Sequence, residues 1–150
     1  MRMPIRVGAI IFKEGKLITT KMKKGNIEYY ILPGGGVEDY ETIEEALKRE
    51  LMEELNLKVK KFRLVYIREL KNKEIGRIIE FYFFIEEYKG KPKKGFDPEV
   101  KESSFEDIIF LELDELNKVT FHPKELINVI KSDKEKGFRE IKHLGLYNYP

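Results

Sequence analysis

LPGGGVEDYETIEEALKRELMEELNL, the stretch from Leu32 to Leu57, joins three consecutive glycines to a segment with the periodicity of a helix. Glycine reaches backbone conformations that other residues avoid, and it lets a ligand approach the main chain closely. Beyond the glycines an apolar residue recurs at every fourth position: Ile43, Leu47, Leu51 and Leu55. This spacing predicts an amphipathic helix from about Thr42 to Leu55 that packs on a sheet.

Three carboxylates lie on one side of this predicted helix. At 100° per residue, Glu54 lies about 40° and Glu53 about 300° from Glu50, at the edge of the apolar stripe. Like charges four residues apart repel one another, and the C-terminal end of a helix disfavours anions. We therefore expect a positive group here. A hard divalent cation such as Mg²⁺ fits because it prefers oxygen ligands, and Arg49 can orient the cluster by pairing with Glu41 or Glu53.

The length and composition fit one compact domain. A chain of 150 residues can bury a hydrophobic core. Hydrophobic residues make up 41% and charged residues 37%, which excludes a disordered chain. Cysteine is absent, which excludes disulfides, thiolate nucleophiles, zinc fingers and iron–sulfur clusters. Any bound metal must then be held by oxygen atoms or by the two histidines, His122 and His143.

The net charge of +2 conceals an uneven distribution of charge. From Glu38 to Glu54 the sequence has eight acidic residues and two basic ones, a balance of −6, which leaves +8 for the rest of the chain. This distribution suits a divalent cation in the acidic segment and an anionic substrate attracted to the surrounding Lys and Arg.

The remaining patterns predict a sheet with a helix on each face. We expect strands over residues 5–12, 16–21, 28–32, 62–70, 77–88 and 108–113, with 77–88 in a central position. Residues 89–106 are polar and are expected to form a mobile loop, and a second helix is expected to open at His122-Pro123 and end near Gly137. Because the helices are separated along the chain, we expect an α/β/α sandwich with a mixed β-sheet between them.

The two ends of the chain carry little pattern. The first apolar run, Val7 to Phe12, is too short for a signal sequence or a membrane span, so we expect a cytoplasmic protein without a membrane partner. Residues 137–150 form a tail that can cover a sheet edge, make a dimer contact or be disordered. The chain can accordingly be a monomer or a homodimer.

A pattern of 23 residues within the opening stretch resembles a known family signature. It reads Gly35-x5-Glu41-x7-Arg49-Glu50-Leu51-x-Glu53-Glu54-x-Asn56-Leu57, and it is similar to the Nudix box, Gly-x5-Glu-x7-Arg-Glu-U-x-Glu-Glu-x-Gly-U, where U is aliphatic. Only Asn56 departs from the signature, and Asn is next to Gly in its tolerance of a left-handed helix cap. The resemblance implies a single Nudix hydrolase domain over residues 1–150, with its core at about 4–136 and the family's sandwich fold.

The resemblance also implies an activity. Nudix proteins are typically Mg²⁺-dependent pyrophosphohydrolases that cleave a nucleoside diphosphate linked to a further moiety, and Mn²⁺ is an alternative ion. By resemblance, the metal ligands are Glu50, Glu53 and Glu54, and the catalytic residues are Arg49, Glu50 and Glu53. Glu50 is either a ligand or the general base. In some members the base lies beyond the box, where Glu102 and Glu106 are the candidates here.

Residues outside the helix are candidates for substrate binding. Those that can meet phosphates are Gly34, Gly35 and Gly36 through the backbone, and Arg6, Lys21 and Lys23 through side chains. Those that can stack on a nucleobase are Tyr30 and Tyr82. Each basic residue can instead be a solvent-facing strand residue, and core packing is an equally good interpretation of Tyr82.

Motifs of Nudix subfamilies narrow the substrate by elimination. The Pro that follows the box by about 15 residues in ADP-ribose enzymes does not occur between Leu57 and Pro92. The Ser-Gln-Pro-Trp signature of NADH enzymes is absent, and so is the Tyr that dinucleoside polyphosphate enzymes have in the region matching 71–76. These absences favour a MutT-like hydrolysis of a nucleoside triphosphate to a nucleoside monophosphate and pyrophosphate.

Two alternatives to this reaction remain open. The first is a non-catalytic module that senses a nucleotide, although such modules often lose a box glutamate and all three are retained here. The second is RNA 5′-end pyrophosphohydrolysis, with Lys58, Lys60, Lys61 and residues 89–94 as its electrostatic footprint. A nucleic acid is not the expected partner, because the sequence pI near 8.6 is only mildly basic.

Overall fold

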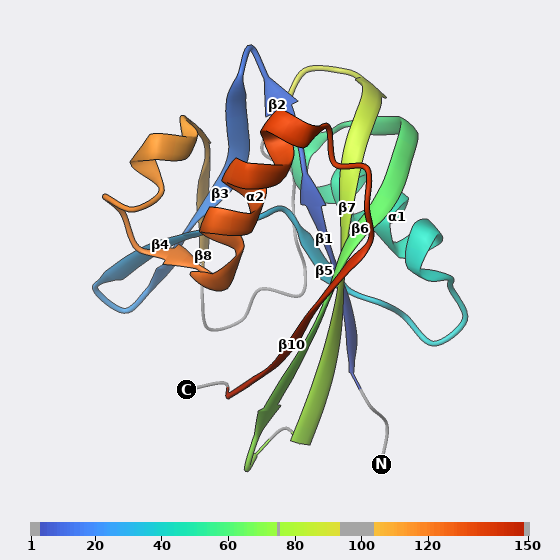
Figure 1. The fold of residues 1–150 in the computed structure, drawn as a ribbon, viewed down its shortest axis with the longest axis vertical. Coiled ribbons are helices and arrows are strands. Elements are labelled where there is room, and N and C mark those ends of the chain that lie inside the picture. The colour runs from blue at the N-terminus through green and yellow to red at the C-terminus, as the bar shows by residue number, and fades with distance from the viewer. Residues whose placement is uncertain (1–3, 75, 94–103, 149–150) are drawn as a thin grey trace.

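The computed structural model describes residues 4–74, 76–93 and 104–148, which form two β-sheets and two α-helices (Figure 1). The strands are β1 (Ile5–Ile10), β2 (Phe12–Lys13), β3 (Lys16–Lys24), β4 (Ile27–Ile31), β5 (Gly34–Gly36), β6 (Lys58–Asn72), β7 (Gly76–Lys89), β8 (Ser104–Leu111), β9 (Phe121–His122) and β10 (Lys142–Asn148). The helices are α1 (Ile43–Leu55) and α2 (Glu125–Lys136), and a short 3₁₀ helix covers Leu113–Glu115.

Both sheets are mixed. The first sheet has the strand order β10-β6-β7-β1-β5, in which β10 is parallel to β6 and β1 is parallel to β7. The second has the order β2-β3-β4-β9, with β8 paired to β3. The predicted sandwich of helices around mixed β-structure is confirmed, and residues 77–88 are central in the first sheet as expected. The strands form two sheets where one was expected, because the expected strand 5–12 is divided at Ile11 into β1 and β2.

Each helix covers its own hydrophobic core, because side chains alternate between the two faces of a sheet. On β1, Val7 and Ala9 join the core under α1, whereas Ile10 joins the core under α2. The stripe on α1 is buried as the spacing predicts, with Leu47, Leu51 and Leu55 inaccessible to solvent. The stripe on α2 comprises Leu126, Ile127 and Ile130.

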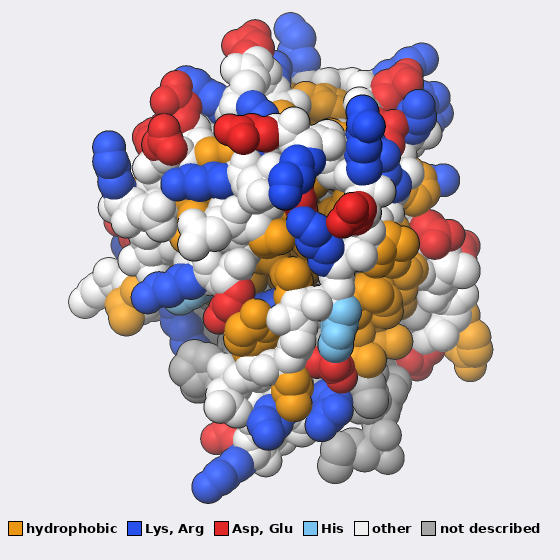
Figure 2. Space-filling model, viewed as in Figure 1, with side chains coloured by type: hydrophobic (Ala, Val, Ile, Leu, Met, Phe, Trp, Pro, Cys, Tyr) orange, Lys and Arg blue, Asp and Glu red, His pale blue; other side chains and the backbone are white. Residues whose placement is uncertain are grey.

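Charged side chains of both signs surround the apolar surface on the face that carries α2 and β10 (Figure 2). Lys and Arg are mixed there with Asp and Glu, so the positive balance outside the acidic segment is not gathered into one basic patch on this face. No helix in the described ranges is long and apolar enough to cross a membrane.

Both ends of α1 lie where the sequence predicted them, whereas α2 starts later than predicted. Thr42 caps α1 through a capping box with Glu45, and Asn56 ends the helix in the left-handed conformation at φ 58° and ψ 37°. α2 begins at Glu125, although the sequence predicted an opening at His122-Pro123. The difference arises because His122 belongs to β9, which pairs in parallel with β4.

Two segments to which the sequence analysis assigned no strand contain strands. β8 begins at Ser104, so the expected loop over 89–106 loses its last residues to the second sheet. The tail forms β10, which lies parallel to β6 and covers an edge of the first sheet. Phe138 anchors the start of the tail by stacking on Phe84, with ring centroids 4.4 Å apart. The sequence left three roles open for the tail, and in the structure the tail covers a sheet edge.

Candidate active site

Arg49 donates hydrogen bonds to four other residues of the box. Its Nε and Nη2 donate to the two oxygens of Glu41 at 3.1 and 2.6 Å. Its Nη1 donates to Glu50 Oε1 at 3.0 Å and to Glu53 Oε2 at 3.2 Å, and Nη2 donates to the carbonyl of Gly36 at 3.0 Å. All five N–H groups of the guanidinium are therefore used, which a lysine cannot reproduce. The sequence predicted that Arg49 pairs with Glu41 or with Glu53, and in the structure Arg49 pairs with both residues.

Glu41 fixes the loop between β5 and α1. Its Oε1 accepts a hydrogen bond from the backbone N–H of Glu38 at 2.9 Å in addition to the bonds from Arg49. The hydrogen bond from Arg49 holds the pKa of Glu41 below its usual value, so Glu41 stays ionised in neutral solution. The Gly36 carbonyl, Glu41 and α1 are thus joined through one guanidinium, which sets the position of β5 relative to the helix.

Gly35 makes room for the carboxylate of Glu50. A Cβ atom added at Gly35 would lie 2.4 Å from the carboxyl carbon and from Oε1 of Glu50, closer than atoms can pack. Glu50 is only 2% exposed, so its carboxylate has little space in which to withdraw. The glycine of the box is therefore required by the position of a buried carboxylate, a physical reason that the sequence pattern alone does not supply.

The three carboxylates of α1 differ in their exposure. Glu50 and Glu54 are buried, with 2% and 5% of their surface exposed, whereas the side chain of Glu53 is 41% exposed. Residues four apart on a helix are neighbours, so Glu50 and Glu54 place two buried carboxylates side by side. Burying two like charges is costly without a compensating positive group. Arg49 supplies one positive charge at Glu50, and a bound divalent cation would add further positive charge beside the three carboxylates.

The chemistry of this donor set fits a hard divalent cation. All three donors are carboxylates, the ligand type that Mg²⁺ and Mn²⁺ accept. Within residues 4–74, 76–93 and 104–148, however, no three Asp, Glu or His side chains are arranged so that they could hold a metal ion as they lie. Glu50, Glu53 and Glu54 are the residues that could supply oxygen ligands from α1, and in the structure Arg49 donates hydrogen bonds to Glu50 and Glu53.

Five predicted substrate-binding residues lie on the first sheet: Gly34, Gly35 and Gly36 on β5, Arg6 on β1 and Tyr82 on β7. Arg6 is exposed on β1, directly beside Gly36 of β5 in the register of the two strands. Tyr82 lies on β7, but it is only 5% exposed, its hydroxyl donates to Glu80 at 2.8 Å, and its ring fills the space above Gly8. Of the two interpretations of Tyr82, base stacking and core packing, its burial agrees with core packing, and no face of its ring is open for a base. Gly34 is closed in by the carbonyl of Val7.

The other predicted residues lie on the second sheet. Lys21 and Tyr30 are partners on β3 and β4, both half-buried, and Lys21 forms an ion pair with Glu28. Lys23 is exposed at the end of β3. The pKa of Lys21 is raised, mainly by its hydrogen bond and ion pair with Glu28. Glu106 is exposed on β8 and lies near enough to Lys21 to add a smaller effect in the same direction. Glu102, the other candidate for a base, lies outside the described residues.

The sequence of the whole domain matches one family. The profile of the NUDIX domain matches residues 2–131, which is most of the chain. The chain belongs to the Nudix hydrolase family. Its relatives include the protein named ADP-ribose pyrophosphatase of Methanocaldococcus jannaschii, which is 35% identical over 126 residues covering 82% of this chain and 70% of that one. The protein named 8-oxo-dGTP diphosphatase of Buchnera aphidicola is 37% identical over 92 residues, which cover 58% of this chain and 68% of the relative.

Solved Nudix structures share the fold. A MutT Nudix hydrolase from Burkholderia pseudomallei superposes with a TM-score of 0.69 at 21% identity, covering 85% of this chain and 96% of that one. This likeness confirms the Nudix-type arrangement of helices and sheets. The family match and the two relatives named above show that the chain is a hydrolase of the Nudix type.

The sequence missed a polar network on the first sheet. Arg68 is 6% exposed and donates to Glu80 and to Glu125, and Glu80 also accepts from Tyr82. These residues lie on β6, β7 and α2, far apart along the chain. The sequence gives no signal of this network, because it does not show which strands become neighbours.

Proposed function

We propose that this Nudix hydrolase uses a divalent cation to cleave the pyrophosphate linkage of a nucleoside diphosphate joined to a further moiety. The observation that carries the proposal is the pair of buried carboxylates, Glu50 and Glu54, on one side of α1. Buried like charges at neighbouring positions are expected where a cation binds. Hydrolases of the family generally use divalent metals, and their substrates are nucleotide derivatives in the relatives named above.

The reaction requires shielding of the negative charge on the two phosphates, a water placed in line, and a stabilised leaving group. Glu50, Glu53 and Glu54 would hold the divalent ion, which when bound would shield the phosphate charge and favour attack by water. Glu50 is either a ligand or the base that takes the proton of the attacking water. Arg49 keeps the carboxylates of Glu50 and Glu53 oriented, so its role in this proposal is positioning.

The first choice of substrate is a nucleoside triphosphate, cleaved to a nucleoside monophosphate and pyrophosphate. The missing motifs of three other subfamilies support this choice, and so does similarity to the Buchnera aphidicola diphosphatase. ADP-ribose is a second candidate, because the Methanocaldococcus jannaschii relative that bears that activity in its name is similar over 82% of this chain. In both substrates the scissile bond joins two phosphates, so the same site chemistry serves.

A substrate panel tests the proposal. Nucleoside triphosphates including 8-oxo-dGTP, ADP-ribose, dinucleoside polyphosphates and a 5′-triphosphorylated RNA are incubated with the enzyme in Mg²⁺ or in EDTA, and the products are separated by chromatography. The variant Glu53→Gln removes one carboxylate of the site. Glu44→Gln is the matched control, since Glu44 is an exposed glutamate in the first turn of the same helix.

We expect Mg²⁺-dependent turnover that is lost in Glu53→Gln and kept in Glu44→Gln, since loss of a ligand lowers both metal affinity and activity. Release of pyrophosphate from triphosphates would identify the first-choice substrate, and AMP with ribose 5-phosphate would identify ADP-ribose. Turnover that persists in EDTA, or equally in Glu53→Gln, would overturn the proposal. Nucleotide binding without turnover would point to a sensing module.

A further inference from the structure

Lysines gather where β6 begins and β7 ends. Residues 58–63 and 86–93 contain seven basic and two acidic residues, a balance of +5, and all seven basic residues are exposed. This is most of the +8 that the chain carries outside its acidic segment. Charges of both signs are mixed over the face seen in Figure 2, but this end of the first sheet has a clear excess of positive charge.

The two strands hold three of these lysines together, Lys58, Lys60 and Lys89, which we call the lysine trio. Lys58 and Lys89 are direct partners in the register of β6 and β7, and Lys60 is the extra residue of a bulge in β6. Their closeness lowers the pKa of Lys60, through the charge of Lys58 first and then that of Lys89. Like charges that face each other on neighbouring strands are destabilising. The fold therefore keeps three positive charges together despite their repulsion.

Acidic side chains do little to neutralise the trio. Glu86 pairs with Lys61 at 3.3 Å and with Arg63 at 2.8 Å, so its charge is already shared by two other basic residues. Glu87 acts on Lys60 more weakly than the other two lysines of the trio do. Within the described residues, no member of the trio forms an ion pair. The positive charge of the trio is thus available to an anionic ligand.

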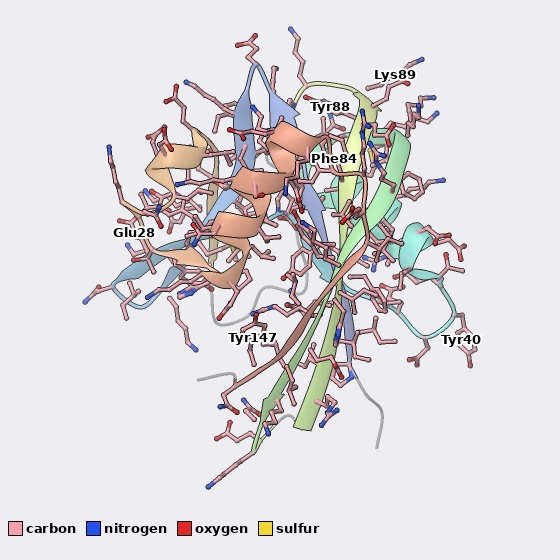
Figure 3. All side chains as sticks on the ribbon, in the orientation of Figure 1. Glu28, Tyr40, Phe84, Tyr88, Lys89 and Tyr147 are labelled. Atoms are coloured by element: carbon pink, nitrogen blue, oxygen red, sulfur yellow. The ribbon has the colours of Figure 1, made fainter. Side chains whose placement is uncertain are left out.

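The strands are open on both sides at this end. β10 pairs with β6 only from Tyr66 onwards, and β1 pairs with β7 only as far as Phe84. The trio therefore lies on a two-stranded ribbon that none of the described strands extends. Figure 3 shows Lys89 at the edge of the molecule, at the end of β7. A long ligand can approach the trio without displacing a strand.

The composition of this surface selects the class of partner. None of the large hydrophobic residues that the described chain exposes lies within 58–63 or 86–93. Protein interfaces are depleted in Lys and enriched in aromatic residues, and helices that bind membranes combine basic residues with apolar ones. A surface of lysines without exposed large apolar side chains suits a phosphate backbone instead, because neutralising the phosphates releases their counterions.

We propose that the lysine trio, together with the exposed Lys91 and Lys93, binds the phosphate backbone of a nucleic acid. The inference goes beyond the proposed function, because it requires neither the divalent ion nor turnover. The expectation against a nucleic acid rested on the pI of the whole chain, which averages this end of the molecule with the acidic segment. Contacts to the backbone carry no sequence information, so binding should depend strongly on salt and little on sequence.

A structural role for the same lysines makes a different prediction. Lys93 donates its backbone N–H to the carbonyl of Leu55 at 2.9 Å, and α1 has no basic residue in its last turn. Positive charge near the C-terminal end of a helix is stabilising. If the trio served the end of α1, removing its charge would lower the melting temperature. Relief of the repulsion within the trio predicts an unchanged or higher melting temperature.

Salt-dependent binding of an RNA oligonucleotide tests the proposal. The probe carries a fluorophore and a 5′-hydroxyl, so it has no phosphoanhydride to cleave, and binding is followed by anisotropy in EDTA over a range of NaCl concentrations. The test variant is Lys60→Gln/Lys89→Gln. The control is Lys13→Gln/Lys16→Gln, which removes the same charge from another pair of lysines that face each other, on β2 and β3. The melting temperature of each protein is measured, and phosphatidylserine vesicles are a second probe.

We expect wild type and the control to bind the RNA alike. Lys60→Gln/Lys89→Gln should bind it at least about tenfold more weakly at low salt. Its slope of log K against log salt should be smaller by about 1.4, which is about 0.7 for each lysine removed. Its melting temperature should not fall.

Three results would overturn the proposal. Absence of RNA binding by wild type, or equal affinities and slopes in the two double variants, would show that the trio is not a specific site. A lower melting temperature of Lys60→Gln/Lys89→Gln with unchanged RNA binding would assign the lysines to the end of α1. Tighter binding of wild type to the vesicles than to the RNA would identify a membrane surface as the partner.

Discussion

At the scale of single residues, Arg49 holds the site together. Its five hydrogen bonds join β5, Glu41, Glu50 and Glu53, and its side chain is only 21% exposed. Arg49→Lys keeps the charge but replaces a planar fork of donors by one ammonium group. We expect it to lower the free energy of unfolding by about 2 kcal/mol and to reduce kcat, because Glu50 and Glu53 lose their orientation. Urea unfolding and steady-state kinetics measure both effects. Unchanged stability and kcat would show that the network is not needed.

The ion pair of Glu41 with Arg49 predicts a dependence of stability on pH. The pKa of Glu41 is lowered in the folded protein, chiefly by the hydrogen bond from Arg49. Its contribution is therefore complete above the unfolded pKa, about 4.3, and is lost as the pH falls through the folded pKa. We expect the gap in unfolding free energy between wild type and Glu41→Gln to be about 1–2 kcal/mol at pH 7 and to shrink below about pH 4. A gap independent of pH would contradict this assignment.

At the scale of elements, α1 could be predicted and β10 could not. The start, stripe and end of α1 depend on residues within one segment, and the structure keeps all three. The partners of a strand depend on distant residues, so the sequence did not reveal that the tail pairs with β6 or that β1 and β2 belong to different sheets. For the same reason the sequence left Tyr82 open between base stacking and core packing, and did not show that its ring packs against Gly8 and its hydroxyl bonds to Glu80.

The cap of α1 gives a prediction at this scale. Asn56 adopts a left-handed conformation at φ 58°, and its N–H bonds to the carbonyls of Leu51 and Met52. Asn56→Gly should raise the free energy of unfolding by about 0.5 kcal/mol, since Gly reaches this conformation without strain. Asn56→Val should lower it by more than about 1 kcal/mol, because β-branched residues are strained there. Chemical denaturation tests the pair, and equal stability of both variants would contradict the role of the cap.

At the scale of the whole molecule, a buried polar cluster fastens the tail to the domain. Asp133 of α2 is 4% exposed and accepts hydrogen bonds from Tyr66 and Lys142, both at 2.6 Å. Asp133→Ala leaves both donors without this acceptor and should lower the free energy of unfolding by about 2–4 kcal/mol. Faster hydrogen exchange across β10 should accompany the loss. Asp114→Ala is the control, since the side chain of Asp114 is 95% exposed. Identical exchange in the two variants would show that β10 is held by other contacts.

The measurement that tests the central claim most directly is binding of Mn²⁺, followed by electron paramagnetic resonance, to wild type, Glu54→Gln and Glu44→Gln. The account predicts that wild type and Glu44→Gln bind the ion alike, and that Glu54→Gln binds it at least about tenfold more weakly, because a buried carboxylate ligand is lost. Equal affinity in all three proteins would contradict the claim that the carboxylates of α1 hold the catalytic cation.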